Sequence, residues 1–446
     1  MIIDFSISNF GPIREEQTLS FEATADDHLE DYYIAEPISG LKLLKLLVLY
    51  GPNASGKSTF LKALDFLGGL CTNPLRAKFE TLDFEPFLFD QKSRKKTSVL
   101  KLNFIVEKIK HSYEVEFTKN YILREVLQYS PKGRIADLYV RETDIENQLS
   151  KVTFGSTTGA NSKKTALIEG NTIWNTTVIG AFNKTNVKIP ELQRVLHWFE
   201  NTLAAVIEPN TNLFSWTSNR IESDPSFKKS VIDIIKQAGI QISGIDIHKV
   251  EKELSEKVIA SLSHLLPKEE MNTIASTKRV TTKNITFKHI IRDKKSKQEI
   301  YDLPKELESQ GTQRFYGLSG VLSMATREEK IILIDELETS LHPDLMKHFL
   351  LIFLANSSMS QMMITTHNIF LLDERDILRN DAIWFTQKKG NGTTELYSLS
   401  DFDTKVIRKN SSIINSYKIG KLGAKPELGN IFITEHYGQN GEKETI

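Results

Sequence analysis

The chain of 446 residues contains a single cysteine, Cys71. One cysteine excludes an intramolecular disulfide and a cysteine-based zinc site, and it fits a protein of the reducing cytosol. No run of about 18 apolar residues occurs, so we expect no membrane span. The first residues, MIIDFSISNFGPI, alternate like a strand and lack the basic segment and long apolar run of a signal peptide. We therefore expect a cytoplasmic protein that makes no contact with a membrane.

The sequence also has no excess of either charge, because Lys plus Arg and Asp plus Glu both number 57. A protein that binds nucleic acid over most of its surface is usually more basic, so any such contact must be local. Apolar heptads never persist for long, which excludes a long coiled-coil arm. Apolar residues nevertheless make up 40% of the chain, enough for a substantial core. The length allows two or three domains, or one large domain with an insertion.

A phosphate-binding motif follows a short apolar run. Leu46–Tyr50 has the pattern of a strand that is buried on both faces, and the next residues, GPNASGKST, fit G-x-x-x-x-G-K-[ST]. In such a loop the backbone N–H groups and the start of the next helix face the phosphates. We expect Lys57 to reach the β- and γ-phosphates and Ser58 to ligate Mg²⁺. The residues predicted to bind the nucleotide here are Asn53, Ala54, Ser55, Gly56, Lys57, Ser58 and Thr59.

Two further apolar runs end in residues suited to the same chemistry. Ile331–Ile334 is followed by Asp335, placed to support Mg²⁺, and by Glu336, placed to polarise an attacking water. The third run, Gln361–Thr365, leads to His367, which could donate a hydrogen bond to the γ-phosphate because residues just beyond parallel strands face the ligand crevice. Together with the phosphate loop, these residues predict an ATP site that uses Mg²⁺.

The segment ESQGTQ, which contains Ser309, Gly311 and Thr312, has two interpretations. A Ser-x-Gly-Thr segment that opens a helix is usually a capping motif. The same Ser309 hydroxyl, Gly311 backbone and positive helix end can also bind a phosphate.

The pattern along the chain suggests an α/β fold. We expect the amino-terminal part of a nucleotide-binding domain, with an antiparallel lobe, over residues 1–129, and a helix-rich insertion over 130–277. The carboxy-terminal part of the domain then spans 278–430, and a flexible tail spans 431–446. Within the insertion, helices are predicted from Pro190 and Pro225, and a third from Val250 to Leu266.

The segment Lys278–Lys297 is very basic and interleaves apolar residues, which predicts a hairpin. A solvated charged face is the usual explanation for such a run, and the alternative is a surface that faces nucleic acid. Its cationic residues are Lys278, Arg279, Lys283, Lys288, Arg292, Lys294, Lys295 and Lys297.

The order GPNASGKST, ESQGTQ, ILIDELETSLHP and ITTHN resembles an ABC-type ATPase head of the SMC-related branch. DELETSLHP, with RNDAIWF and YKIGKLGAKP, is most similar to the OLD/RloA class of stand-alone ATPases in prokaryotic anti-phage (abortive infection) systems. The resemblance covers about 1–125 and 280–430. It implies an ABC-type P-loop head, a mixed sheet with an antiparallel β lobe, plus the insertion.

The same resemblance assigns roles to individual residues. It implies that Lys57 and Ser58 are Walker A residues, that Asp335 is the Walker B residue and that Glu336 is the catalytic base. Ser309 to Thr312 would be the signature motif, although it departs from LSGGQ, Thr339 to His342 the D-loop, and His367 the switch histidine. Gln91 is the candidate for the glutamine that bridges the two lobes. Family geometry further implies that two heads enclose two ATP molecules, each signature completing the other subunit's site.

Three functional hypotheses follow. The first is an ATP-driven sensor or scaffold that controls a separate effector, a nuclease or another toxin, in anti-phage defence. About 80 residues follow His367, too few for a further nuclease domain beside the closing strands. The second is a DNA repair or recombination ATPase of the SMC/RecF kind that binds DNA through Lys278–Lys297. The third, a small-molecule kinase, is disfavoured by the order of the motifs.

Overall fold

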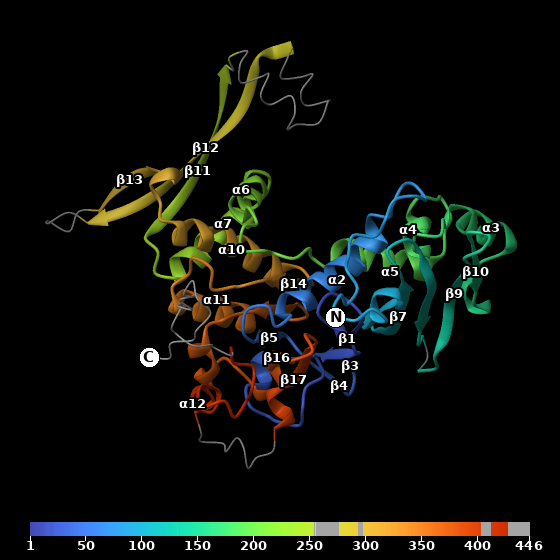
Figure 1. The fold of residues 1–446 in the computed structure, drawn as a ribbon. Coiled ribbons are helices and arrows are strands. Elements are labelled where there is room, and N and C mark those ends of the chain that lie inside the picture. The colour runs from blue at the N-terminus through green and yellow to red at the C-terminus, as the bar shows by residue number, and fades with distance from the viewer. Residues whose placement is uncertain (132, 254, 256–275, 293–297, 403–411, 427–446) are drawn as a thin grey trace, which may run out of the picture.

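The computed structural model describes residues 1–131, 133–253, 255, 276–292, 298–402 and 412–426 (Figure 1). A five-stranded sheet in the order β14-β15-β5-β16-β17 lies at its centre. The first four strands of this order are parallel, and the last pairs antiparallel with its neighbour. Their bounds are β5 (Leu46–Tyr50), β14 (Ile331–Ile334), β15 (Gln361–Thr365), β16 (Ile383–Lys388) and β17 (Thr394–Ser398).

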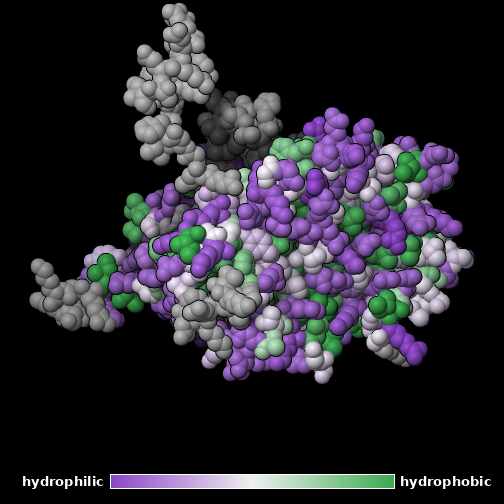
Figure 2. Space-filling model, turned by 60° about the horizontal axis from the view of Figure 1, so that its bottom comes forward, coloured by the Kyte–Doolittle hydropathy of each residue, from purple (hydrophilic) through white to green (hydrophobic). Residues whose placement is uncertain are grey.

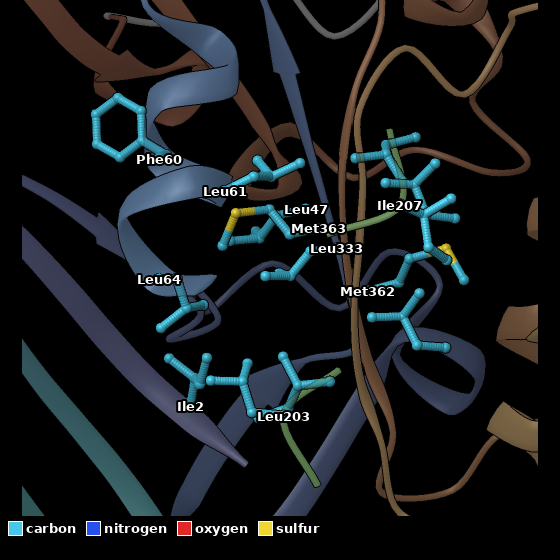
Figure 3. Packing of buried hydrophobic residues seen from close by; sticks show 14 of the residues in the cluster. Ile2, Leu47, Phe60, Leu61, Leu64, Leu203, Ile207, Leu333, Met362 and Met363 are labelled. Atoms are coloured by element: carbon cyan, nitrogen blue, oxygen red, sulfur yellow. The ribbon is translucent and has the colours of Figure 1, made fainter. Parts of the chain in front are cut away.

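The apolar runs form strands because both faces of this sheet are covered. Every residue of β5, β14 and β15 is buried. Figure 3 shows Leu61 of helix α2 (Lys57–Thr72) beside Met363, whereas Met362 points to the opposite face, toward Ile207. Helices α10 (Gln310–Arg327) and α11 (Pro343–Asn356) complete this core. The phosphate loop, the acidic pair and His367 all follow the same edge of the sheet, where parallel strands end.

The second sheet has seven antiparallel strands in the order β10-β9-β8-β7-β6-β1-β2 and forms the predicted lobe. It extends beyond the predicted boundary at residue 129, because β9 pairs with β8 and β10 pairs with β9. The polar composition of this segment obscured both strands, although Leu138, Tyr139 and Val152 are buried. The bounds are β1 (Ile2–Ser8), β2 (Gln17–Ser20), β6 (Ser98–Val106), β7 (Ile109–Phe117), β8 (Ile122–Tyr129), β9 (Ala136–Asp144) and β10 (Leu149–Phe154).

The remainder of the insertion packs on the head in two groups. Its helices are α3 (Ser162–Asn171), α4 (Val178–Asn183), α5 (Pro190–Asn201), α6 (Leu213–Ser223) and α7 (Pro225–Gln237). Two of them begin at the predicted prolines. Helices α4 and α5 contact α2, whereas α6 and α7 contact α10. Between the groups, Ala204 and Ile207 donate backbone hydrogen bonds to Ile331 and Leu333 and so cover the edge of β14.

A three-stranded sheet, β11 (Ile242–Glu253), β12 (Arg279–Arg292) and β13 (Gln298–Pro304), forms an arm. Figure 1 shows its two hairpins pointing away from the body in different directions. The predicted hairpin of the basic segment is confirmed by the pairing of β12 with β13. The predicted third helix is wrong at Val250–Glu253, which pair with β12 as a strand, and residues 256–266 lie outside the described residues. The tip 293–297 and the predicted tail 431–446 also lie outside them.

The smaller elements close the molecule. They are α1 (Glu30–Tyr33), β3 (Ile34–Ile38), β4 (Leu41–Leu44) and α12 (Ile413–Lys418), with 3₁₀ turns at Ser93–Lys95, Ser156–Thr158, Lys305–Leu307, Ile369–Asp373, Asn380–Ala382 and Leu399–Asp401. Hydrophilic residues predominate on the face shown in Figure 2, with hydrophobic ones scattered among them. In the described part of the chain, no helix combines the length and the apolar character needed to cross a bilayer.

Candidate nucleotide site

The phosphate loop curls around its own lysine. The Nζ of Lys57 donates hydrogen bonds to the carbonyl oxygens of Gly51 and Pro52, at 2.8 and 3.1 Å. Gly56 has φ +99° and immediately precedes α2, so the loop enters the helix in a conformation that favours glycine. The backbone N–H groups at the start of α2 therefore face the hollow of the loop, as phosphate binding requires.

Strands β16 and β17 hold this loop from behind. The hydroxyls of Ser55 and Thr386 are 2.6 Å apart, and Thr394 donates a hydrogen bond of 2.8 Å to the Ser55 carbonyl. The approach is so close that a Cβ on Gly51 would lie 2.5 Å from the carbonyl oxygen of Thr386, and one on Gly56 would lie 2.6 Å from the Thr394 hydroxyl. Sequence reasoning missed both threonines, because nothing in their local sequence links them to a loop some 330 residues earlier.

A pocket of about 440 Å³ opens in front of the loop. It brings the predicted residues of the loop together with two from other strand ends, Glu336 and His367. Pro12 and Lys388 also line it and were not predicted. The full lining is Pro12, Asn53, Ala54, Ser55, Gly56, Lys57, Ser58, Thr59, Glu336, His367 and Lys388.

Asp335 lies behind the pocket and contacts the loop. The Ser58 hydroxyl donates to its Oδ1 at 2.8 Å, and the Thr365 hydroxyl donates to the same oxygen at 2.6 Å. A hydroxyl beside a carboxylate is an oxygen donor set that fits Mg²⁺, which keeps several waters and takes further ligands from phosphates. Among the described residues no group of three or more His, Cys, Asp or Glu side chains gathers at one point. A cation held by Ser58 and Asp335 therefore needs phosphate and water oxygens to complete its shell.

One hydroxyl organises both acidic residues. Besides donating to Asp335, the Thr365 hydroxyl accepts the N–H of Glu336 at 2.9 Å. Glu336 has φ +48°, a conformation that costs a residue with a side chain of order 1 kcal/mol and that persists only where the surroundings fix it. The contact with Thr365 is such a constraint, and it turns the half-buried Glu336 side chain into the pocket.

The charges of the site influence one another. Burial lowers the pKa of the Lys57 ammonium, while the nearby carboxylates oppose that shift. The pKa of His367 is also lowered, first by partial removal of water from the ring and next by the charge of Lys57. The negative charge of Glu338, which the sequence did not single out, opposes the lowering of both pKa values, as do the charges of Asp335 and Glu336. The lowered pKa favours the neutral His367 ring, which can take part in a hydrogen bond without adding positive charge.

The ESQGTQ segment caps a helix in this chain. Ser309 is the N-cap of α10, and its hydroxyl accepts the N–H of Thr312 at 3.0 Å. Gly311 packs against the predicted D-loop, since a Cβ there would lie 3.0 Å from the carbonyl oxygen of Ser340. None of Ser309, Gly311 and Thr312 lines the pocket, and neither does the exposed Gln91. The capping interpretation thus describes the single chain, in which Ser309 is exposed and lies outside the pocket lining.

Three cations of the basic segment, Arg279, Lys283 and Lys288, are engaged in ion pairs. Lys283 pairs with Glu222 at 2.6 Å, and Lys288 pairs with Asp246 at 2.7 Å. Arg279 lies 3.3 Å from carboxylate oxygens of β11. Lys294, Lys295 and Lys297 fall outside the described residues. Carboxylates therefore balance the positive charge of the arm at these three positions.

Three solved structures illustrate the likeness of the fold. An SMC head domain from Thermotoga maritima shares 12% identity at a TM-score of 0.40, over 89% of this chain and 98% of that one. An Smc head bound to the C-winged helix domain of ScpA shares 11% identity at a TM-score of 0.44, over 89% of this chain and 97% of that one. An Smc head domain with an extended coiled coil, bound to the C-terminal domain of ScpA and derived from Pyrococcus furiosus, shares 13% identity at a TM-score of 0.40. This match covers 95% of the present chain and 99% of that one.

A comparison with curated proteins gives no match. A family match spans residues 46–373, from the strand before the phosphate loop to the turn after His367. This range includes the loop, the acidic pair and the strand ends that build the pocket. With the strand order and the P-loop geometry, it establishes a P-loop ATPase fold of mixed α/β structure, and the chain belongs to the family described as "AAA domain, putative AbiEii toxin, Type IV TA system".

Proposed function

We propose that this chain is a Mg²⁺-dependent ATPase that closes as a homodimer around ATP and controls a separate effector in anti-phage defence. The observation that carries the ATPase chemistry is the junction of Ser58, Asp335 and Thr365, with Glu336 held beside it at the pocket. A phosphate loop alone occurs in many kinds of enzyme. This junction places beside the loop one carboxylate that can support Mg²⁺, Asp335, and a second that can activate water, Glu336.

Each side chain has a task that follows from its position. Lys57 and the N–H groups of the loop bind the phosphates, and Ser58 with Asp335 would hold Mg²⁺, which supplies neutralisation of the phosphate charge. Glu336 would orient and activate the attacking water. A neutral His367 would donate a hydrogen bond to the terminal phosphate across the pocket.

A second copy of the chain would complete each site. Ser309 is exposed and does not line the pocket of its own chain, yet it carries a hydroxyl on a helix N-terminus beside the predicted D-loop. Facing a partner's phosphates, that group could stabilise their charge. The resemblance to the OLD/RloA class and the family's description as part of a toxin–antitoxin system support a role in defence with a second component. The alternative, a DNA repair ATPase of the SMC/RecF kind, is weaker because Arg279, Lys283 and Lys288 of the arm are paired with carboxylates.

Two variants test the proposal. Glu336→Gln keeps the shape of the side chain but removes the charge that activates water, so turnover should fall by at least about 100-fold while ATP still binds. Lys57→Ala should lose ATP binding itself, because it removes a charge that faces the phosphates. ATP hydrolysis by Glu336→Gln at the wild-type rate would refute the assigned chemistry. Tight, salt-sensitive binding of duplex DNA to the wild-type protein would instead favour the repair ATPase.

A further inference from the structure

Phe89 is an exposed aromatic residue that the fold holds in place. Its side chain is 71% exposed. The ring nevertheless packs closely on Gly392, where an added Cβ would lie 2.8 Å from the ring's Cδ2. Phe87, which is buried, meets the same ring edge-on with the centroids 5.7 Å apart. The ring is thus supported by neighbours and still open to solvent over most of its surface.

This ring lies beside the nucleotide pocket. Gly392 belongs to the turn between β16 and β17, and Lys388 and Thr394 flank that turn. The Nζ of Lys388, a residue of the pocket lining, is 5.5 Å from the centroid of the Phe89 ring. Thr394 supports the phosphate loop from behind and donates a backbone hydrogen bond to Pro12, which also lines the pocket. The phosphate loop and the aromatic ring therefore rest on one hairpin.

We propose that Phe89 is the stacking platform for the nucleobase of the bound nucleotide, with Lys388 bridging the platform and the phosphates. This assignment rests on the proposed ATPase function and adds a binding site for the base. A planar base has an apolar face that the open ring matches, and stacking of this kind tolerates either purine. Lys388 lines the pocket and its ammonium lies over the Phe89 ring, so it can attract the electron-rich ring and a phosphate oxygen at once.

The test separates the base from the phosphates by using two probes, ATP and inorganic triphosphate, each with Mg²⁺. Phe89→Ala should weaken ATP binding by about 5- to 150-fold, the loss that a single base–aromatic stack supports. Its affinity for triphosphate should stay at the wild-type value. Phe89→Tyr, which keeps the ring, should bind ATP like the wild type. Phe79→Ala is the matched control, since Phe79 is 84% exposed and, among the described residues, has no ring contact with a cation of the pocket such as that of Phe89 with Lys388.

The outcomes are distinct. Unchanged ATP affinity in Phe89→Ala overturns the assignment of the platform, even while wild-type ATP hydrolysis upholds the proposed function. An equal loss of ATP and triphosphate affinity also overturns it, because Phe89 would then shape the phosphate pocket alone. Wild-type protein that binds triphosphate but not ATP, or neither, refutes the proposed ATPase and this platform together.

Discussion

The backbone N–H of His367 donates a hydrogen bond of 2.6 Å to Oε1 of Glu338. His367 follows β15, and Glu338 follows β14, so this bond joins the ends of two neighbouring strands at the pocket. The other carboxylate oxygen of Glu338, Oε2, is buried and has no hydrogen-bond partner among the described residues. A buried carboxylate oxygen without a hydrogen bond lowers the stability of the fold. We therefore expect the position of the Glu338 carboxylate to matter for the site. We infer that Glu338 is a positioning residue that fixes where His367 meets the phosphate.

The first prediction follows from that bond. Glu338→Gln keeps an acceptor for the His367 N–H but removes a charge that raises the pKa of His367. The pKa of His367 should then fall further, and ATPase activity that needs the neutral ring should persist to lower pH than in the wild type. The acid limb of the pH profile of kcat measures this shift.

Glu338→Ala should behave differently, because it removes the acceptor as well. We expect kcat to fall by about 10- to 100-fold through misplacement of His367, with little change in KM. Glu306→Gln, a change at an exposed glutamate on the surface, is the control. An acid limb that stays in place or moves to higher pH in Glu338→Gln would contradict the inferred role.

The sequence singled out those residues of the candidate site that local motifs encode. Lys57, Ser58, Asp335 and Glu336 each lie in a short motif next to an apolar strand, so their spacing reveals them. Thr365 was visible only as a strand residue, although its hydroxyl holds both acids. Such contacts depend on which strands become neighbours in the folded sheet, and that order is not written in any local pattern. The same reason conceals Thr386, Thr394 and Lys388.

The errors in the fold have a related cause. Residues from Val250 onward have apolar spacing that suits a helix, but Val250–Glu253 pair with β12, and strand pairing overrides a weak local preference. The polar segment after residue 129 gave no clear period, yet β9 and β10 continue the lobe because β8 offers them an edge. The predicted helix starts at Pro190 and Pro225 were correct, since a proline start signal is local.

The second prediction concerns the homodimer. Ser309→Arg should block the exposed helix start, and Lys57→Ala should disable the phosphate loop, so neither variant alone should hydrolyse ATP. Mixed in equal amounts, the two should recover part of the activity, because one site of a mixed dimer keeps both intact halves. ATPase assays on titrated mixtures measure the recovery. If mixed dimers form and activity does not return, each site is complete within one chain.

The third prediction compares two glycines in helices. A Cβ on Gly320 of α10 would lie 2.2 Å from the Thr217 hydroxyl of α6, so the two helices meet there without room for a methyl group. Gly320→Ala should lower the free energy of unfolding by about 1–3 kcal/mol through overpacking. Gly69 of α2 has no atom within 4 Å of an added Cβ, and Gly69→Ala should raise stability by about 0.5–1 kcal/mol. Urea denaturation should therefore give changes of opposite sign, and a shared sign would contradict the close contact of α6 with α10.

The last prediction concerns a buried acid between the lobe and the insertion. Glu125 of β8 is fully buried and accepts hydrogen bonds from the hydroxyls of Tyr113 and Tyr139, at 2.8 and 2.6 Å. It also accepts the N–H of Val178 at the start of α4, at 2.9 Å. Burial raises the pKa of Glu125, and the positive charge of Arg141 opposes that shift. The carboxylate thus satisfies donors from the lobe and from the insertion at once.

Glu125→Ala would leave two hydroxyls and a helix N–H buried without their acceptor. It would also leave the buried Arg141 without the nearby negative charge, so we expect a loss of about 3–5 kcal/mol in the free energy of unfolding. Glu114→Ala on the neighbouring strand β7 is the matched control. It removes an exposed ion pair with Arg124 at 3.0 Å and should change stability by no more than about 1 kcal/mol. Denaturant titrations of both variants measure the difference. Equal effects would mean that solvent reaches Glu125, and that the acid does not hold the insertion to the lobe.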